Sequence, residues 1–209
     1  MSKNYWLALS FILAGLTGFY WGQGTSAPTG SADLLSALSG TSPANSKPFV
    51  ADDRVKAADC IINGAYPDHE CTPGAVFPNV TTTQTCVAGY TKTVRNVSVS
   101  LKKQVYQEYG IPYPPTFGSY EADHFIPLTL GGSNEIGNLF PEAAAPKPGF
   151  REKDIVENYL HEQVCDGHIL LPAAQRAIAT DWLAVYKSMS PSDIARLKAK
   201  YADWSKTGD

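Results

Sequence analysis

The sequence predicts an α+β fold in which a short hairpin and flanking helices follow a loop-rich, disulfide-stapled N-terminal part. Residues 120–142, YEADHFIPLTLGGSNEIGNLFPE, place two stretches of strand character on either side of a glycine turn. The residues after 150 carry apolar side chains at helical spacing. Fifteen prolines and seventeen glycines in 209 residues indicate many loops and argue against a plain helical bundle.

The chain divides into three predicted regions. Residues 1–22 carry one early cation, Lys3, and then a long charge-free apolar run, which predicts a signal peptide or an uncleaved membrane anchor. Residues 23–50 are small, polar and rich in Pro, Gly and Ser, which is typical of a flexible linker. The folded domain is expected over 51–209. We therefore expect an exported protein that is periplasmic, extracellular or anchored to the membrane.

The cysteines predict disulfides. Cys60, Cys71, Cys86 and Cys165 make an even number, and export would place them in an oxidising compartment. Four cysteines allow three pairings. We favour Cys60–Cys71, which closes a short loop, with Cys86–Cys165 clamping the start of the domain to its central helix. Zinc ligation is the alternative, and it is weakened because no two cysteines have CxxC spacing.

The first half of the domain is expected to be irregular. Residues 51–97 hold three cysteines, several prolines and the β-favouring run NVTTTQTCV, which predicts loops with short strands. Residues 98–110 then predict a helix, because Ser98 or Ser100 can cap its start and Gly110 can end it.

Three helices are predicted in the second half. Residues 151–167 carry an apolar stripe at helical spacing and end at a glycine. Residues 171–189 have a proline in the first turn. Residues 190–204 begin with a capping Ser190 followed by a proline.

Asp123 and His124 are the candidate chemical centre. Hydrolysis of a phosphodiester needs a base for water, a cation that neutralises phosphate charge, and a group that holds the base in the right tautomer. At the twisted end of a strand, Asp123 can reach a metal while His124 reaches the water beside it. Asn138 follows a tight turn that can bring it opposite His124. Its amide could hold the hairpin loop by backbone hydrogen bonds and so steady the base.

The stretch DHFIPLTLGGSNEIGNL resembles the DH-x-x-P-L-x-x-GG-x-N…NL signature of the HNH (His-Asn-His) endonucleases, which have a ββα-metal fold. The order of hairpin, loop and KD-x-x-E helix resembles an exported bacterial branch of that superfamily, and the match covers residues 120–165. The resemblance implies an HNH-like ββα-metal core. It also implies that Asp123 is a metal ligand, His124 the general base and Asn138 the residue that orients the base.

The last metal ligand of the family usually lies early on the helix after the hairpin. Here the sequence departs from the pattern, because the matching positions carry Phe150, Arg151 and Glu152. The nearest side chains that could serve are Asp154, Glu157, Asn158 and His161. Of these we take Glu157 and His161 as the candidate metal ligands.

The resemblance implies a divalent-metal-dependent endonuclease that cleaves nucleic acid with little sequence specificity. Mg²⁺ is the favoured metal and Mn²⁺ the alternative. A net charge of −3 gives no global attraction to DNA or RNA, so both would be held by local phosphate contacts. Lys147, Arg151 and Lys153 gather at the start of the predicted central helix and are candidates. An unpaired imidazole base predicts that activity falls below about pH 6.

Two alternatives use the same sequence features. A non-catalytic module on an HNH-like scaffold in the cell envelope would bind nucleic acid or a protein without cleaving, and the incomplete ligand pattern on the helix favours it. A structural protein of the envelope would use the N-terminal segment and linker to present a disulfide-stapled domain.

Overall fold

The computed structural model describes residues 37–39 and 43–202. The predicted signal or anchor at 1–22 and most of the predicted linker lie outside the described residues. Within the described part, no helix is both long enough and apolar enough to cross a membrane.

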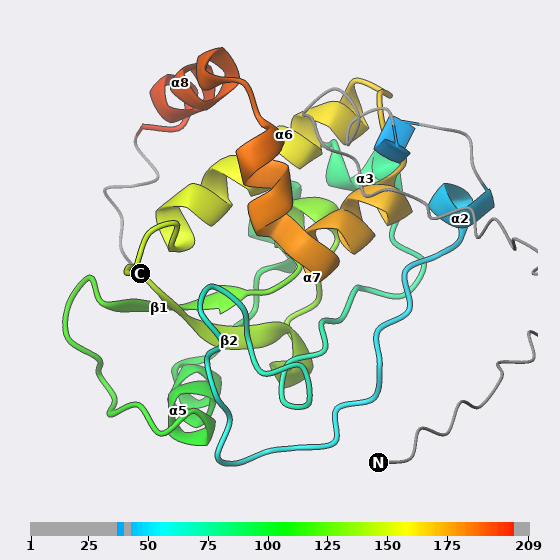
Figure 1. Ribbon diagram of the computed structural model, residues 1–209. Coiled ribbons are helices and arrows are strands. Elements are labelled where there is room, and N and C mark those ends of the chain that lie inside the picture. Colours follow the sequence, from blue (N-terminus) through cyan, green and yellow to red (C-terminus); the bar gives the residue numbers. More distant parts are fainter. Residues whose placement is uncertain (1–36, 40–42, 203–209) are drawn as a thin grey trace, which may run out of the picture.

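Over the described residues the fold is α+β, as predicted, with a single two-stranded sheet. In Figure 1 the β1–β2 hairpin lies between helices α6 and α7 on one side and α5 on the other. The elements that position the site, in chain order, are α2 (Pro43–Ser46), α3 (Thr82–Thr85), α4 (Tyr90–Val94), α5 (Val99–Glu108), β1 (Tyr120–His124), η1 (Leu128–Leu130), η2 (Ile136–Asn138), β2 (Leu139–Ala143), α6 (Phe150–Cys165), α7 (Leu171–Ser188) and α8 (Pro191–Lys200).

The hairpin is shorter than its sequence pattern. β1 and β2 pair antiparallel, with Asp123 opposite Phe140 and His124 opposite Leu139. Beyond His124 the chain leaves the sheet and forms the 3₁₀ turns η1 and η2 instead of extending the strands. The hairpin therefore ends at the two candidate residues.

The predicted helix caps are confirmed. Ser98 accepts a hydrogen bond from the Leu101 N–H at 3.1 Å at the start of α5. Ser190 does the same for the Asp193 N–H at 3.0 Å at the start of α8. Each cap satisfies a backbone donor that the first turn of a helix leaves without a partner.

The predicted short strands before residue 97 are wrong. Residues 51–97, all of them described, contain isolated bridges but no strand. Helix α3 lies within the threonine-rich run that predicted extended chain, and α4 follows it. The reason is a capping box, in which the Gln84 N–H donates to Thr81 Oγ1 and the Thr81 N–H donates to Gln84 Oε1. The two reciprocal bonds favour a helical turn over the β propensity of threonine.

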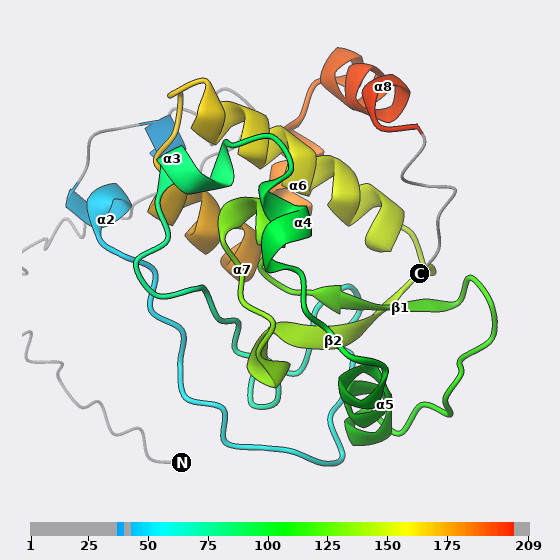
Figure 2. The same ribbon diagram turned by 180° about the vertical axis from the view of Figure 1, so that it is seen from behind.

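Both favoured disulfides are present. Cys60 pairs with Cys71, and Cys86 pairs with Cys165. The first lies in a small apolar cluster with Phe125 and Phe140 under the hairpin. The second joins the end of α3 to the end of α6, which lie side by side in Figure 2. Two disulfides fit an oxidising, exported location.

The main core lies between the hairpin turn, α6 and α7. Its fully buried members include Ile126, Leu130, Val156, Leu160, Ile178 and Trp182. Part of the predicted linker also packs here, since Arg176 on α7 donates to the carbonyls of Lys47 and Asn45 at 2.7 and 2.8 Å. The chain therefore joins the domain several residues before position 51.

Candidate functional site

Asn138 fastens the turn that follows β1. It is fully buried, and its amide makes four hydrogen bonds. Its Oδ1 accepts from the Ile126 and Ala75 N–H groups, and its Nδ2 donates to the carbonyls of Ile126 and Ser133. The amide oxygen accepts two hydrogen bonds and the amide nitrogen donates two, which is the full capacity of the group. The side chain is therefore held within the turn.

Gly132 completes the same turn. A Cβ at this position would lie 1.7 Å from the Ile126 carbonyl oxygen, so no larger residue fits without moving the backbone. The neighbouring Gly131 adopts a positive φ of 78°, a conformation that glycine reaches without steric cost. The double glycine is thus required by the shape of the turn beside His124.

His124 is buried, and its ring is oriented by Asn134. The distance from His124 Nε2 to Asn134 Oδ1 is 3.2 Å. The amide orientation of Asn134 is fixed, because Nδ2 donates to the Val94 carbonyl and Oδ1 accepts from the Asn96 N–H. A carbonyl oxygen only accepts, so His124 Nε2 donates and Nδ1 keeps its lone pair.

The surroundings keep His124 neutral. Burial lowers the pKa of its imidazole to about 4, and the positive charges of Arg95 and Lys153 act in the same direction. The Asp123 carboxylate and the Asn134 hydrogen bond oppose this shift without cancelling it. At neutral pH the ring is therefore an uncharged base, and its depressed pKa makes it a weaker base than an ordinary histidine.

Lys153 on α6 lies at the centre of an acidic cluster. The cluster consists of Asp123 on β1, Glu142 on β2, and Lys153, Asp154 and Glu157 on α6. The side chain of Lys153 is fully buried. Its Nζ lies 3.0 Å from Asp123 Oδ2, 2.8 Å from the His124 carbonyl oxygen, 2.5 Å from Glu157 Oε1 and 3.3 Å from Glu142 Oε2. One ammonium thus ties both strands to α6.

Asp123 and Lys153 form the charged pair of this cluster. Burial opposes the charge on Lys153, but the surrounding carboxyl groups outweigh it and raise its pKa well above the ordinary value. Burial likewise opposes the charge on Asp123, yet the ammonium lowers the pKa of this carboxyl to about 2. Both residues are therefore charged throughout the physiological range.

The remaining carboxyls of the cluster resist ionisation. Burial and the charge of Asp123 raise the pKa of Glu142 well above the ordinary value, and neither of its oxygens has a hydrogen bond within the described structure. Burial also raises the pKa of Glu157 to about 7 and that of Asp154 to about 8. Near neutral pH, Glu157 and Asp154 are therefore each protonated in only part of the molecules.

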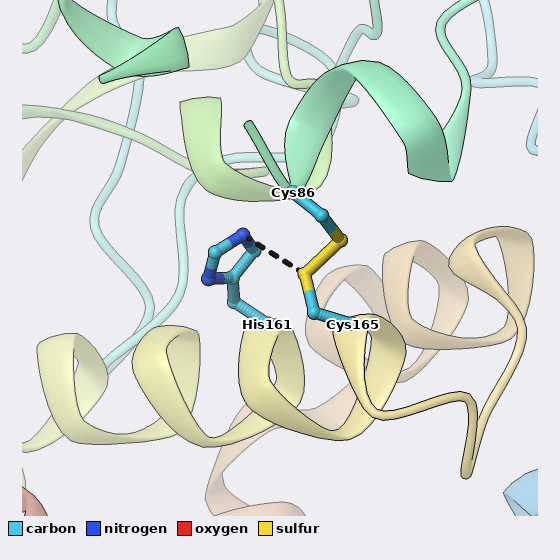
Figure 3. Close-up of side chains that lie close together, drawn as sticks. All are labelled: Cys86, His161 and Cys165. Carbon is cyan, nitrogen blue, oxygen red and sulfur yellow. Dashed lines mark hydrogen bonds between the residues drawn. A yellow bond between two sulfur atoms is a disulfide. The ribbon is translucent and has the colours of Figure 1, made fainter. Parts of the chain in front are cut away.

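The structure brings three of the predicted site residues together. Asp123 and Glu157 meet at the Lys153 ammonium through their carboxylates, and His124 reaches it through its backbone carbonyl oxygen. Asn138 lies in the turn that follows β1. His161 has other neighbours: its Nε2 lies 3.0 Å from the Thr85 carbonyl and 3.4 Å from Cys165 Sγ. Figure 3 shows its ring directed at the Cys86–Cys165 disulfide.

The sequence analysis assigned no role at the site to two residues, Asn134 and Glu142, and assigned a different role to Lys153. Asn134 is the asparagine of the GG-x-N motif, its fourth position, and that spacing was the signal that could have assigned it to the base. Glu142 and Lys153 carried no such signal. Lys153 was predicted as a phosphate contact at the helix surface, but it is turned into the molecule and fully buried. Only the docking of α6 on the hairpin reveals this.

The carboxylates partly suit a hard divalent cation. Lys153 contacts one oxygen of Asp123 and one of Glu157, so each carboxylate keeps a second oxygen. Mg²⁺ is often held by one or two carboxylates together with water and substrate phosphates rather than by a complete protein cage. Within the described residues, the acidic cluster does not form a closed group of three ligands around one ion. The free carboxylate oxygens of Asp123 and Glu157 therefore suit a cation whose remaining ligands are water and the substrate phosphate.

Comparisons with protein-family models, with curated proteins and with solved structures find no match to this chain.

Proposed function

We propose that the chain is a divalent-metal-dependent endonuclease that hydrolyses phosphodiester bonds of DNA or RNA on an HNH-like ββα core. The observation that carries this proposal is His124, held neutral in the tautomer that leaves the lone pair on Nδ1, with Asp123 beside it at the end of β1. Strand, strand and helix follow in the order that the sequence resemblance implies.

The chemistry assigned to each side chain follows from its surroundings. Nδ1 of His124 takes the proton from the attacking water, and Asn134 holds the ring in the tautomer that this step needs. Asn138 keeps the turn, and with it the base, in place. Mg²⁺, or Mn²⁺ as the alternative, held by Asp123 and Glu157 would polarise the scissile phosphate and stabilise the leaving oxygen.

Exposed cations near the site suit phosphate contacts. Arg95 is exposed and close enough to influence the charge of both His124 and Glu157. Lys147, Arg151 and Lys198 line a pocket of about 310 Å³ between α6 and α8, and Asp154 borders the same pocket. Such contacts bind any sequence, in keeping with low specificity. We place the protein outside the cytoplasm, either released after cleavage of residues 1–22 or held by them in the membrane.

The test is cleavage of supercoiled plasmid and of single-stranded RNA by the full-length, disulfide-bonded protein with Mg²⁺, Mn²⁺ or EDTA. We expect metal-dependent nicking that His124→Ala lowers by about 10²-fold or more, the range for loss of a general base. His168→Ala is the matched control, because His168 is exposed and lies outside the site. Cleavage that persists in EDTA and in His124→Ala would contradict the mechanism.

A non-catalytic binding module is the second candidate, and Lys153 is the observation that favours it. Its ammonium already supplies a positive charge to the cluster, so the carboxylates are stable without any metal. This candidate predicts that the protein binds nucleic acid or a protein but never nicks plasmid with either metal. Binding without nicking would therefore select it over the nuclease.

A further inference from the structure

The Cys86–Cys165 disulfide lies beside an imidazole. Cys165 is the last residue of α6, and His161 lies one turn earlier on the same helix. The ligand atoms of Cys86, His161 and Cys165 all lie within 4.8 Å of one another. In Figure 3 the disulfide joins Cys86 at the end of α3 to Cys165 on α6, and the His161 ring on α6 lies beside it with a hydrogen bond to Cys165.

These three side chains form a ligand set of the kind that zinc uses. A histidine and a cysteine four residues apart lie on one face of a helix. Thiolate sulfur and imidazole nitrogen are the usual ligands of structural and catalytic Zn²⁺, and ligands often come as a close pair on a helix and another from a separate segment. The Cys60–Cys71 disulfide, whose residues are both buried, belongs to no such group within the described structure.

We propose that reduction of the Cys86–Cys165 disulfide converts it into a Zn²⁺ site formed by Cys86, His161 and Cys165. The site is independent of the proposed nuclease activity. The fourth position of a tetrahedral ion would be left for water or another oxygen or nitrogen ligand. The disulfide and the metal are mutually exclusive, because each uses both sulfur atoms.

The conversion requires a dithiol reductant. One thiolate of the reductant attacks the sulfur of Cys165, which is an exposed residue, and the Cys86 sulfur leaves as a thiolate. The second thiol of the reductant then attacks the mixed disulfide, which releases Cys165 and leaves the reductant oxidised to its own disulfide. Zn²⁺ binds the two thiolates, and any protons that they have gained are released.

The metal would replace one cross-link with another. Both the disulfide and the Zn²⁺ would join the end of α3 to the end of α6, across 79 residues of sequence. His161 would exchange its present contact with the Thr85 carbonyl for the metal. The reduced chain would thus keep α6 attached at its C-terminal end only while the metal is bound.

The experiment is a titration of the full-length protein with Zn²⁺ against a chromogenic chelator, before and after reduction by a dithiol. Co²⁺ serves as the spectroscopic probe, because thiolate ligation produces an intense charge-transfer absorption. We expect the reduced protein to bind one equivalent tightly and the oxidised protein to bind none at this site. His161→Ala should weaken binding at least about tenfold, the lower bound for losing even an outer-shell contact.

The matched control is the double variant Cys86→Ser/Cys165→Ser, which keeps the other two cysteines and reports any binding that reduced Cys60 and Cys71 contribute. Equal binding by this variant and by the reduced wild-type chain would overturn the proposal. So would unchanged affinity in His161→Ala. Near-UV circular dichroism follows folding in each sample, and a signal lost on reduction that Zn²⁺ does not restore would likewise count against it.

Discussion

Lys153 carries a full positive charge in a position with no exposed surface, where lysine is rarely found unless it is paired. Its partners come from three directions: Asp123 on β1, Glu142 on β2 and Glu157 one turn further along α6. Removal of one member of a buried ion pair leaves the others without compensation. The stability of the fold should therefore depend strongly on the charge of this single side chain.

Lys153→Met tests that dependence. The substitution keeps most of the apolar volume but removes the charge, so we expect the free energy of unfolding to fall by about 3–5 kcal/mol. Urea denaturation at pH 7 measures the change. Lys187→Met is the control, because Lys187 is exposed at the end of α7 and should change stability by no more than about 0.5 kcal/mol. Equal effects of the two substitutions would show that the ammonium contributes nothing to the fold.

His124 should titrate far below an ordinary histidine. Burial lowers its pKa from 6.5 to about 4, so the unfolded chain binds more protons between those pH values. The contribution of neutral His124 to stability is complete above about pH 6.5 and is lost as the pH falls towards 4. NMR of the imidazole, assigned with His124→Gln, should give a midpoint close to 4. A midpoint close to 6.5 would contradict the buried, neutral ring. Because the ring stays neutral, the proposed nuclease should also remain active at pH values below about 6, the limit that the sequence alone predicted.

At the scale of elements, the sequence predicted what depends on local chemistry. The helices at 98–110, 151–167 and 171–189 follow from caps, glycines and apolar spacing, which act within a few residues. The threonine-rich run before Cys86 was predicted as strand because propensity was weighed without the Thr81–Gln84 capping box. The burial of Lys153 depends on contacts with Asp123 on β1, thirty residues away in sequence, and with Glu142 on β2, which no local pattern encodes.

In the candidate site, too, local sequence predicts some features, whereas others depend on long-range contacts. Asp123 and His124 were chosen as candidates because they are adjacent and precede a glycine turn. The orienting role went to Asn138, yet Asn134 is the residue that contacts the ring. Both asparagines follow the turn, and sequence spacing does not reveal which amide points back to the base and which is fixed within the backbone.

The turn itself can be tested through its glycines. Gly132→Ala would place a Cβ 1.7 Å from the Ile126 carbonyl, so we expect a loss of more than about 3 kcal/mol in the free energy of unfolding. Gly137→Ala is the control in the adjacent η2 turn, because the nearest atom to its Cβ lies 3.6 Å away. Thermal and urea denaturation of the two variants give the comparison. A mild effect at Gly132 would mean that the turn adapts and that the double glycine is not needed there.

At the scale of the whole molecule, the local charge around the candidate site differs in sign from the net charge of the chain. The chain is acidic overall, with a net charge of −3, but Arg95, Lys147 and Arg151 lie exposed around the candidate site. Binding of nucleic acid must then come from a few local phosphate contacts, and the affinity should be modest and sensitive to salt.

Arg95→Gln measures one of those contacts. With Mg²⁺ and the His124→Ala background to prevent cleavage, we expect weaker binding to all sequences alike. The slope of log K against log salt should also fall by about one. Fluorescence anisotropy with labelled duplex DNA at several salt concentrations gives both quantities. Lys187→Gln removes the same charge from the end of α7 and should leave the slope unchanged. Identical slopes for both variants would remove Arg95 from the binding surface.

The central ammonium also constrains the order in which the chain folds. Before β1, β2 and α6 meet, Lys153 has only Glu157 of the same helix as a carboxyl partner and lacks Asp123 and Glu142. Its burial without those two partners is unfavourable, because transfer of a poorly paired charge into an apolar interior costs free energy. Pairing of the hairpin and docking of α6 should therefore occur as one kinetic event rather than in sequence. Substitutions at Asp123 and Lys153 should then give similar φ-values, although one lies on a strand and the other on a helix.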